Sequence, residues 1–284
     1  MRDKSHLLLC LQAAVQAGEA ILTIYHSDFT VEKKEDESPL TLADQRAHQI
    51  ISNFLAETKI PVLSEEGRQI DYGQRRDWER LWIVDPLDGT KEFVNRNGEF
   101  TVNIALVENG WPVMGVIYVP VKEILYFGMV GRGGYKLENA AGLAGDIAAG
   151  RLTLGEICSR ARKLPLDVPS REILTIVGSR SHMTEAVEAF VEGKRAEHGA
   201  VDFVAAGSSL KICLVAEGSA DIYPRLGATM EWDIAAGQAI AESAGARLYY
   251  YETGKRMRYN RKDLKNPWFV VERAIPDATN RRRE

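Results

Sequence analysis

Apolar residues recur at helical spacing in the first part of the chain. Between residues 5 and 25 they fall every three or four positions with polar residues between them, which predicts an amphipathic helix. The charged residues 32–37 predict an exposed turn or hairpin. Residues 41–54 predict a second helix, with Asp44 in or near its first turn.

Two short apolar runs follow, and each ends in acidic residues. The first covers residues 61–63 and leads into Ser64-Glu65-Glu66-Gly67, and the second covers residues 80–84 and ends on Asp85. Short apolar runs bounded by turn residues are typical of buried strands. The pattern therefore predicts two strands that carry carboxylates at their ends.

The rest of the chain changes from a hairpin pattern to an alternating one. Residues 101–107, 113–119 and 124–129 predict antiparallel hairpins. After them, residues 137–172 carry no clear pattern, and we place a boundary there between a first lobe, 1–165, and a second lobe, 166–284. The second lobe predicts strands that alternate with helices, which favours an α/β arrangement: strands at 173–177, 220–224 and 267–272, and helices at 182–194, 207–216 and 233–244.

Composition and charge exclude several classes of function. The 284 residues are 45% hydrophobic and 27% charged, and the net charge of −4 disfavours nucleic acid as the main partner. Three cysteines without metal-type spacing favour a reducing compartment. We expect a cytoplasmic protein, because the N-terminus has the pattern of neither a signal peptide nor a membrane span. Peripheral association with the inner membrane stays open, as does the choice between monomer and homodimer.

The placement of the carboxylates carries the chemistry. Asp85 and Asp88 follow an apolar strand, Glu65 ends another, and Asp233 precedes a helical stretch. Strand ends and helix starts can direct several carboxylates to one point, where a hard cation such as Mg²⁺ would neutralise their repulsion. Taken one at a time, these acids are also typical of ordinary turns and helix N-caps.

The string from Trp82 to Phe93 is more specific than any single acid. Its centre reads Asp85-Pro86-Leu87-Asp88-Gly89-Thr90. The two aspartates can share metal ions, and the carbonyl of Leu87 can add a third oxygen. If Gly89 and Thr90 open a helix, their backbone N–H groups face a phosphate. We therefore predict a metal-dependent phosphatase.

These motifs resemble those of the inositol monophosphatase superfamily of lithium-sensitive, magnesium-dependent phosphatases. The resemblance covers roughly residues 5–272 and includes Thr41-Leu42-Ala43-Asp44, Glu65-Glu66, Asp85 to Thr90 and Glu231 to Gly237. It implies a five-layered α/β/α/β/α sandwich with two lobes and the site between them.

Within that superfamily the chain is most similar to the 3'(2'),5'-bisphosphate nucleotidases. The residues that carry this likeness lie outside the metal motifs, at 34–41, 178–182, 207–211 and 215–225. The likeness implies hydrolysis of adenosine 3',5'-bisphosphate to AMP and phosphate, with 3'-phosphoadenylyl sulfate as a second substrate. Gly227-Ala228-Thr229 departs from the usual Gly-Pro-Thr, and loss of the proline is expected to loosen that turn.

The resemblance also implies roles in metal binding and catalysis. Two or three Mg²⁺ ions would be held, one by Glu65, Asp85 and the Leu87 carbonyl, another by Asp85, Asp88 and Asp233, and a third loosely by Glu65. Thr90 with Asp44 would accept and orient the proton of the attacking water, since a threonine hydroxyl alone is too weak a base. The alternative for Asp44 is a helix acid in the first turn, stabilised by the dipole.

The substrate residues rest on weaker motifs. The metal ligands Glu65, Leu87, Asp88 and Asp233 would also contact substrate, Gly89 and Thr90 would hold the phosphate that is removed, and His182, Ser208, Lys211 and Arg225 are candidates for the nucleotide and its 5'-phosphate. Ser208 could instead be a helix N-cap, His182 a helix-start residue, and the two cations ordinary surface charges. Glu66 is expected behind the metal ligands, and Cys213 is expected in the core.

Two other functions stay open at this point. The same chemistry could act on an inositol phosphate or a sugar bisphosphate. A non-catalytic nucleotide or metal sensor is less compatible with the sequence, because Glu65, Asp85, Asp88, Thr90 and Asp233 are all present.

Overall fold

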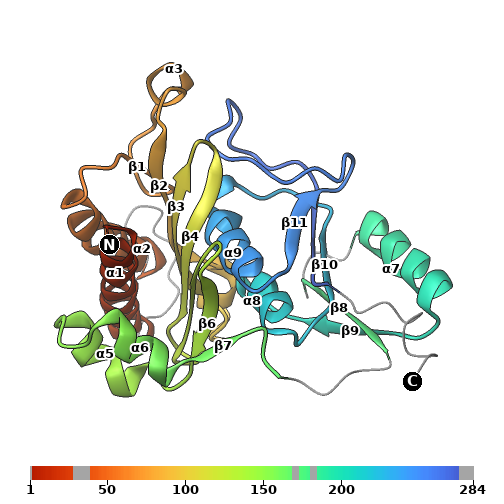
Figure 1. Ribbon diagram of the computed structural model, residues 1–284, viewed down its shortest axis with the longest axis horizontal. Coiled ribbons are helices and arrows are strands. Elements are labelled where there is room, and N and C mark those ends of the chain that lie inside the picture. Colours follow the sequence, from red (N-terminus) through yellow and green to blue (C-terminus); the bar gives the residue numbers. More distant parts are fainter. Residues whose placement is uncertain (1, 28–38, 168–172, 180–183, 275–284) are drawn as a thin grey trace.

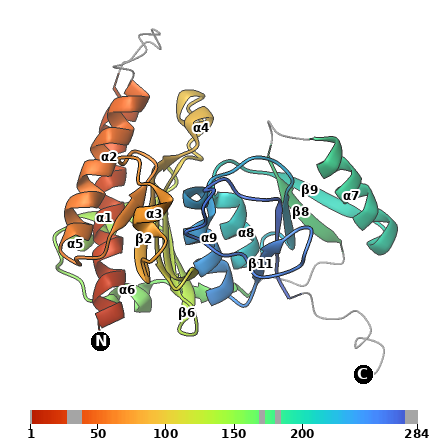
Figure 2. The same ribbon diagram turned by 90° about the horizontal axis from the view of Figure 1, so that it is seen from above.

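The computed structural model describes residues 2–27, 39–167, 173–179 and 184–274. Its described residues form five layers, in which helices and sheets alternate (Figures 1 and 2). One helical layer contains α1, α2, α5 and α6, and a second, with α8 and α9, lies between the two sheets. Helix α7 covers the far face of the second sheet. The five-layered sandwich predicted from the sequence is confirmed.

The bounds of the elements are as follows. The helices are α1 (Arg2–Tyr25), α2 (Pro39–Ala56), α3 (Tyr72–Arg75), α4 (Thr90–Val94), α5 (Ala141–Ala148), α6 (Leu154–Arg160), α7 (Glu185–His198), α8 (Leu210–Glu217) and α9 (Glu231–Ser243). The strands are β1 (Val62–Ser64), β2 (Arg80–Asp88), β3 (Thr101–Glu108), β4 (Trp111–Val119), β5 (Ile124–Met129), β6 (Gly133–Leu137), β7 (Arg162–Leu164), β8 (Leu174–Gly178), β9 (Val201–Ala205), β10 (Ile222–Arg225), β11 (Arg247–Tyr250) and β12 (Phe269–Glu272).

The first sheet follows chain order. Among the described residues it has seven strands in the order β1 to β7, with β1 parallel to β2 and every later pair antiparallel. Sequence-adjacent antiparallel strands need only short turns, so the hairpins predicted from residue 101 onward are confirmed. Helix α1 is long and apolar enough to span a membrane by composition alone, but its apolar side chains are buried in the core of the first sheet.

The second sheet has a different topology. Its described strands lie in the order β11-β12-β10-β8-β9, with β10, β8 and β9 parallel and β11 and β12 antiparallel to their neighbours. Helix α9 packs directly on the first sheet, because Gly115 of β4 has no side chain. A Cβ atom on Gly115 would lie 2.2 Å from the carbonyl oxygen of Ala236. This close contact brings the start of α9, with Asp233, near the ends of β1 and β2.

Several elements differ from the prediction or were not predicted. Helix α2 begins at Pro39, which places Asp44 in the second turn, so Asp44 is not the first-turn dipole acid considered above. Strand β2 does not end on Asp85 but continues to Asp88. Part of the unassigned region 137–172 forms α5, α6 and β7, while β6, β9, β11 and α3 were not predicted. The predicted turn at 32–37 lies outside the described residues.

Candidate active site

The irregular end of strand β2 places its two aspartates. Asp85 pairs with Asn103 and Asp88 with Thr101, and the register shifts between these two pairs. A shift of this kind bends the strand and redirects its side chains. The backbone N–H of Leu87 donates to Asp85 Oδ1 at 3.1 Å, which fixes one carboxylate oxygen within the bend. The metal-ligand role of the Leu87 carbonyl stays a prediction.

Gly89 turns the chain from the strand into helix α4. Its φ of +102° lies in the left-handed region, and a Cβ atom there would lie 2.1 Å from Ser208 Oγ. Only glycine therefore fits both the backbone conformation and the close approach of Ser208. Thr90 begins α4, which confirms that Gly89 and Thr90 open a helix. Its first N–H groups are available for an anion, since the start of a helix leaves them unpaired.

Three carboxylates from separate elements meet at one point. Strand β1 is parallel to β2, with Ser64 opposite Val84, so the next residues along the chain, Glu65 and Asp85, become neighbours. Asp233, in the first turn of α9, completes the group. Carboxylate oxygens of Glu65, Asp85 and Asp233 lie within 4.8 Å of one another. Asp233 is not the helix N-cap considered above, because Met230 holds that position; Asp233 lies three residues further on, where one of its oxygens accepts from the Met230 N–H at 2.9 Å and the other stays available.

The clustered carboxylates have raised pKa values, because nearby cationic side chains do not offset their burial and mutual repulsion. Burial and the neighbouring carboxylates Asp88 and Glu65 raise the pKa of Asp85 well above its ordinary value. Burial, then Asp88, raise the pKa of Asp233 to about 8. The pKa of Glu65 is raised for the same reasons. The pKa of Asp88 is raised by burial too, although Lys211, the Ser209 N–H and the Asn103 side chain oppose that rise.

Asp44 reaches the same region from helix α2. Burial raises its pKa to about 8, and the charges of Glu66 and Glu65 add to the rise. Its Oδ1 atom is buried and has no hydrogen-bond partner among the described residues. The pairing with Thr90 expected from the sequence is therefore not formed through that oxygen, and Thr90 itself is exposed. Crowded carboxylates and an unpaired buried oxygen fit a hard divalent cation, which prefers oxygen ligands.

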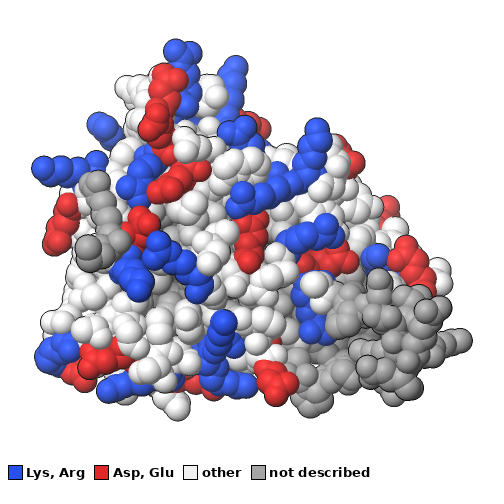
Figure 3. Space-filling view, in the orientation of Figure 1, with Lys and Arg blue, Asp and Glu red and all other residues white. Residues whose placement is uncertain are grey.

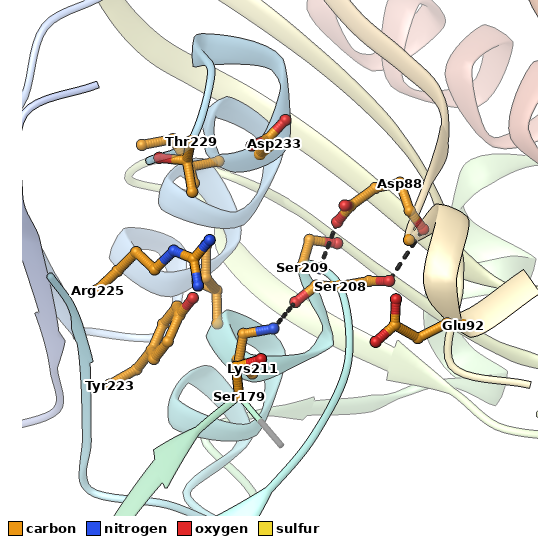
Figure 4. Close-up of a pocket in the computed structure, with 13 residues that line it drawn as sticks. Asp88, Glu92, Ser179, Ser208, Ser209, Lys211, Tyr223, Arg225, Thr229 and Asp233 are labelled. Atoms are coloured by element: carbon orange, nitrogen blue, oxygen red, sulfur yellow. Dashed lines mark hydrogen bonds between the residues drawn. The ribbon is translucent and has the colours of Figure 1, made fainter. Parts of the chain in front are cut away.

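A cavity beside the acidic group contains the predicted cations. Its lining residues include Asp88 and Asp233, with Lys211 and Arg225 across from Asp88 and with Ser208 beside Asp88 (Figure 4). The Lys211 Nζ atom donates to the carbonyls of Ser208, at 2.7 Å, and Ala206, at 3.3 Å. An ammonium group has three N–H donors, so one is left that no other described residue accepts.

Lys211 and Arg225 are not ordinary surface charges. Lys211 is buried, and this burial lowers its pKa to about 8. Arg225 donates to the Ala228 carbonyl at 2.8 Å, and its Nε atom is buried without a hydrogen-bond partner in the described part of the chain. The turn at 227–229 lacks the usual proline at Ala228. A hydrogen bond stabilises it at the following residue, where the Thr229 carbonyl accepts from the Asn266 N–H at 2.8 Å.

Ser208 is not a helix N-cap. The residue before α8 is Ser209, while the Ser208 hydroxyl donates to the Asp88 carbonyl at 2.9 Å. Ser208 also has a positive φ of 48°, uncommon for a residue with a side chain. Such conformations cost energy and cluster at functional sites. His182 lies outside the described residues, so its predicted contact stays a prediction. Cys213 is fully buried, as predicted.

Sequence reasoning missed five polar residues that line the cavity, although each lies in a motif already quoted. They are Glu92, Ser179, Ser209, Tyr223 and Thr229. For Tyr223 a signal existed, because alternate residues of a strand share one face and Tyr223 is two positions before Arg225.

Comparison with known proteins fixes the family. Residues 3–281 match the inositol monophosphatase family. The chain belongs to this family. The CysQ protein of Salmonella typhimurium, a 3'(2'),5'-bisphosphate nucleotidase, is 42% identical over 265 residues, which cover 92% of this chain and 96% of that protein. CysQ of Escherichia coli K12, of the same name, is 41% identical over the same length.

Solved structures of the inositol monophosphatase family agree with the fold. The crystal structure of CysQ from Bacteroides thetaiotaomicron, described as a bacterial member of that family, superposes with a TM-score of 0.88. It is 49% identical in sequence and covers 96% of this chain and 98% of its own. A SuhB protein from Bartonella henselae gives a TM-score of 0.66 at 25% identity. Enzymes of the inositol monophosphatase family depend on a metal, which agrees with the acidic group at Asp85.

Proposed function

We propose that the protein is a magnesium-dependent phosphatase that removes the 3'-phosphate of adenosine 3',5'-bisphosphate, giving AMP and phosphate. The names of its CysQ relatives support this activity. One observation of the structure carries the proposal. A single cavity combines an acidic side, at Asp88 and Asp233, with a cationic side, at Lys211 and Arg225.

The two sides suit a substrate with two phosphates. The phosphate to be removed would lie at the acidic side, where bound cations and the first N–H groups of α4 meet it. The second phosphate would lie at Lys211 and Arg225, since ammonium and guanidinium groups bind phosphate oxygens strongly. An inositol monophosphate has no second phosphate, so it would leave Lys211 and Arg225 without an anion to bind.

Five positions would hold the metal. Glu65, Asp85 and the Leu87 carbonyl form one set, and Asp85, Asp88 and Asp233 form another. When bound, Mg²⁺ supplies the positive charge that stabilises a phosphate in its transition state and lowers the pKa of water. Carboxylates with raised pKa values fit this role, because each becomes fully ionised only when a cation offsets the repulsion between them.

Residues around the phosphate would orient it and accept the proton of the attacking water. The N–H groups at Gly89 and Thr90 would orient its oxygens, and Thr90 and Asp44 would accept and orient the proton of the attacking water. A pKa of about 8 in the absence of a cation makes Asp44 a better base than an ordinary carboxylate. Its unpaired Oδ1 atom is in keeping with that task.

The proposal extends to the finer expectations from the sequence. It includes 3'-phosphoadenylyl sulfate as a second substrate and a cytoplasmic location, which the free cysteines Cys10, Cys158 and Cys213 support. It also keeps the division into lobes 1–165 and 166–284, because the first sheet ends at β7 and the second begins at β8. On the face shown in Figure 3, Lys and Arg are interspersed with Asp and Glu among the described residues, which supports a small-molecule substrate over a nucleic acid.

The test is a comparison of substrates. Phosphate release from adenosine 3',5'-bisphosphate, inositol 1-phosphate and fructose 1,6-bisphosphate is measured with Mg²⁺ and compared as kcat/KM. We expect the adenosine bisphosphate to be preferred, with inhibition by millimolar lithium. A higher kcat/KM for either of the other two substrates would assign the protein to another branch of the family.

A further inference from the structure

Two buried polar residues of strand β3 have no part in the reaction described so far. Thr101 is 0% exposed and Asn103 is 1% exposed. They are two positions apart on one strand, so their side chains point to the same face. In the antiparallel pairing with β2 they lie opposite Asp88 and Asp85, on either side of the register shift.

Both side chains meet the hydroxyl of Ser209. Ser209 Oγ donates to Asn103 Oδ1 at 2.8 Å, and Thr101 Oγ1 lies 2.8 Å from the same Ser209 oxygen. A hydroxyl has one proton, and Ser209 gives its proton to Asn103, so Thr101 is the donor in the second contact. The three side chains form a directed chain of hydrogen bonds, from Thr101 to Ser209 to Asn103.

Ser209 connects this chain to the metal site. Its backbone N–H donates to Asp88 Oδ2 at 2.5 Å. This short contact uses one oxygen of Asp88 and leaves the other for a cation. The next residue, Leu210, begins helix α8, which carries Lys211. Ser209 therefore lies between a metal ligand and the residues proposed to bind the second phosphate.

A second carboxylate of the first sheet's lobe holds the same segment from its other end. The Gly207 N–H donates to Glu99 Oε2 at 2.9 Å, and Lys122 Nζ donates to Glu99 Oε1 at 3.0 Å. Glu99 is buried, so Lys122 offsets a charge that would otherwise be costly. The segment 207–209 is thus tied to the first sheet's lobe at both ends, although the helix that follows it packs between the sheets.

We propose that Thr101 and Asn103 are positioning residues. Through Ser209, and for Asn103 also through its own contact with Asp88, they hold the metal ligand Asp88 and the phosphate-binding segment 207–211 in one fixed mutual orientation. The inference rests on the metal site of the proposed function. Because one group holds both parts, binding of the cation and of the nucleotide should strengthen each other, and such coupling is reciprocal.

The test measures binding rather than turnover. Titration calorimetry gives the Kd of Mg²⁺ with and without saturating AMP, the proposed product, for the wild-type protein and for Thr101→Val and Asn103→Leu. Both substitutions keep side-chain size and remove hydrogen-bonding groups. Since loss of an outer-shell partner weakens metal binding by roughly 10- to 100-fold, we expect an increase of that order in the Kd and loss of the strengthening by AMP.

Matched variants separate positioning from stability. Thr175→Val removes a buried hydroxyl from β8, outside the site, and should leave the Kd of Mg²⁺ unchanged. Thr101→Ser keeps the donor and should restore both the Kd and the coupling. If Asn103→Leu does not fold, Ser209→Ala breaks the same chain of hydrogen bonds while it retains the N–H to Asp88, and its effect on the Kd decides.

Two results overturn the inference. One is a Kd of Mg²⁺ within about twofold of wild type in Thr101→Val and Ser209→Ala, because losing a hydrogen bond that supports a metal ligand should change the Kd by more than that. The other is strengthening by AMP that persists in both variants. Failure of the proposed function gives a different result: the wild-type protein would then not release phosphate from adenosine 3',5'-bisphosphate, whatever the calorimetry shows.

Discussion

The two sides of the cavity differ in charge and in the way the protein tolerates that charge. The acidic side, Asp88 and Asp233, belongs to a larger acidic group that also contains Asp44, Glu65 and Asp85, and burial and neighbouring carboxylates raise the pKa values of all five. The cationic side consists of Lys211 and Arg225, and burial lowers the pKa of Lys211 to about 8. Each side is therefore built to receive a charge from outside, metal cations on the acidic side and a phosphate on the cationic side.

The two sides also come from different parts of the fold. The acidic residues lie mainly on α2 and at the ends of β1 and β2, with α9 adding Asp233. The cationic residues lie on α8 and β10, and strand β10 belongs to the second sheet. The chemistry can thus stay fixed in one part while substrate choice is set in another. Family members that act on different phosphates are expected to differ on the cationic side first.

The largest expected effect comes from neutralising the acidic side. Asp85→Asn removes a charge with little change in size, so the fold should be retained. Loss of an outer-shell partner costs about 10- to 100-fold in activity, and loss of a ligand should cost more. We expect kcat for adenosine 3',5'-bisphosphate to fall by well over a hundredfold, measured as phosphate release at saturating Mg²⁺.

A matched substitution on the surface is the control for this variant. Asp202, on β9, is exposed, and Asp202→Asn should retain wild-type turnover. Circular dichroism and Tm check that Asp85→Asn is folded. Unchanged turnover in a folded Asp85→Asn protein would remove the metal assignment, and the two sides would no longer differ in function.

The next effect comes from the cationic side. Lys211→Met keeps the length of the side chain and removes its charge, and a hydrogen bond to a charged group is worth about 1.5–3 kcal/mol. We expect kcat/KM for adenosine 3',5'-bisphosphate to fall by roughly 10- to 100-fold, mainly through KM. Adenosine 3'-monophosphate lacks the second phosphate and should lose much less.

The exposed Lys255 provides the comparison for that measurement. Lys255→Met removes the same charge at a residue that does not line the cavity, so it should not change KM for either substrate. An equal loss for the two nucleotides in Lys211→Met would show that Lys211 supports Asp88 rather than the second phosphate.

The acidic side could be predicted from the sequence in more detail than the cationic side. Asp85 and Glu65 stand close behind apolar runs, and the ends of neighbouring parallel strands meet, so their proximity follows from local pattern and topology. The contact of Asp88 with Ser209 could not be foreseen, because it joins residues 121 positions apart through a backbone N–H that any residue type provides.

The same limit explains the elements and contacts that were missed. Strand β9 alternates between half-buried and exposed residues at the sheet edge, so its sequence, Val201 to Ala205, has a weak apolar pattern. Asp44 was correctly assigned to the second helix, but whether its carboxylate pairs with Thr90 depends on side-chain geometry that no spacing specifies, and its Oδ1 atom forms no such bond among the described residues. Gly89 carried a clear signal for a turn, whereas its contact with Ser208 depends on how the two parts of the fold dock.

A third prediction concerns that docking point. Gly89→Ala introduces a Cβ atom 2.1 Å from Ser208 Oγ at a φ of +102°. Gly131 also has a positive φ, +79°, but nothing lies within 4 Å of the position its Cβ would take. Gly131→Ala therefore measures the backbone strain alone, of about 1–3 kcal/mol.

We expect Gly89→Ala to lower Tm more than Gly131→Ala and to reduce kcat/KM by about tenfold, since the clash displaces the segment that contains Ser208. Gly131→Ala should retain its activity. If the two variants behave alike in both Tm and kcat/KM, strain alone explains Gly89, and the close approach of the two sides has no functional effect.

The smallest effect is a change of stability with pH in the metal-free protein. In the folded chain the pKa values of Asp44 and Asp233 are raised from 3.8 to about 8, so the folded state binds more protons than the unfolded chain between these values. Their contribution to stability is present at low pH and is lost as the pH rises towards about 8.

With a chelator, we expect Tm to fall as the pH is raised from about 5.5 to 8.5, and Mg²⁺ should suppress most of that fall because it replaces the protons. Lys211, whose pKa is lowered to about 8, titrates in the same range, so Lys211→Met in chelator is the control: it should retain the fall, whereas Asp233→Asn should reduce it. A metal-free Tm that rises over this range would contradict the charge crowding on which the comparison of the two sides depends.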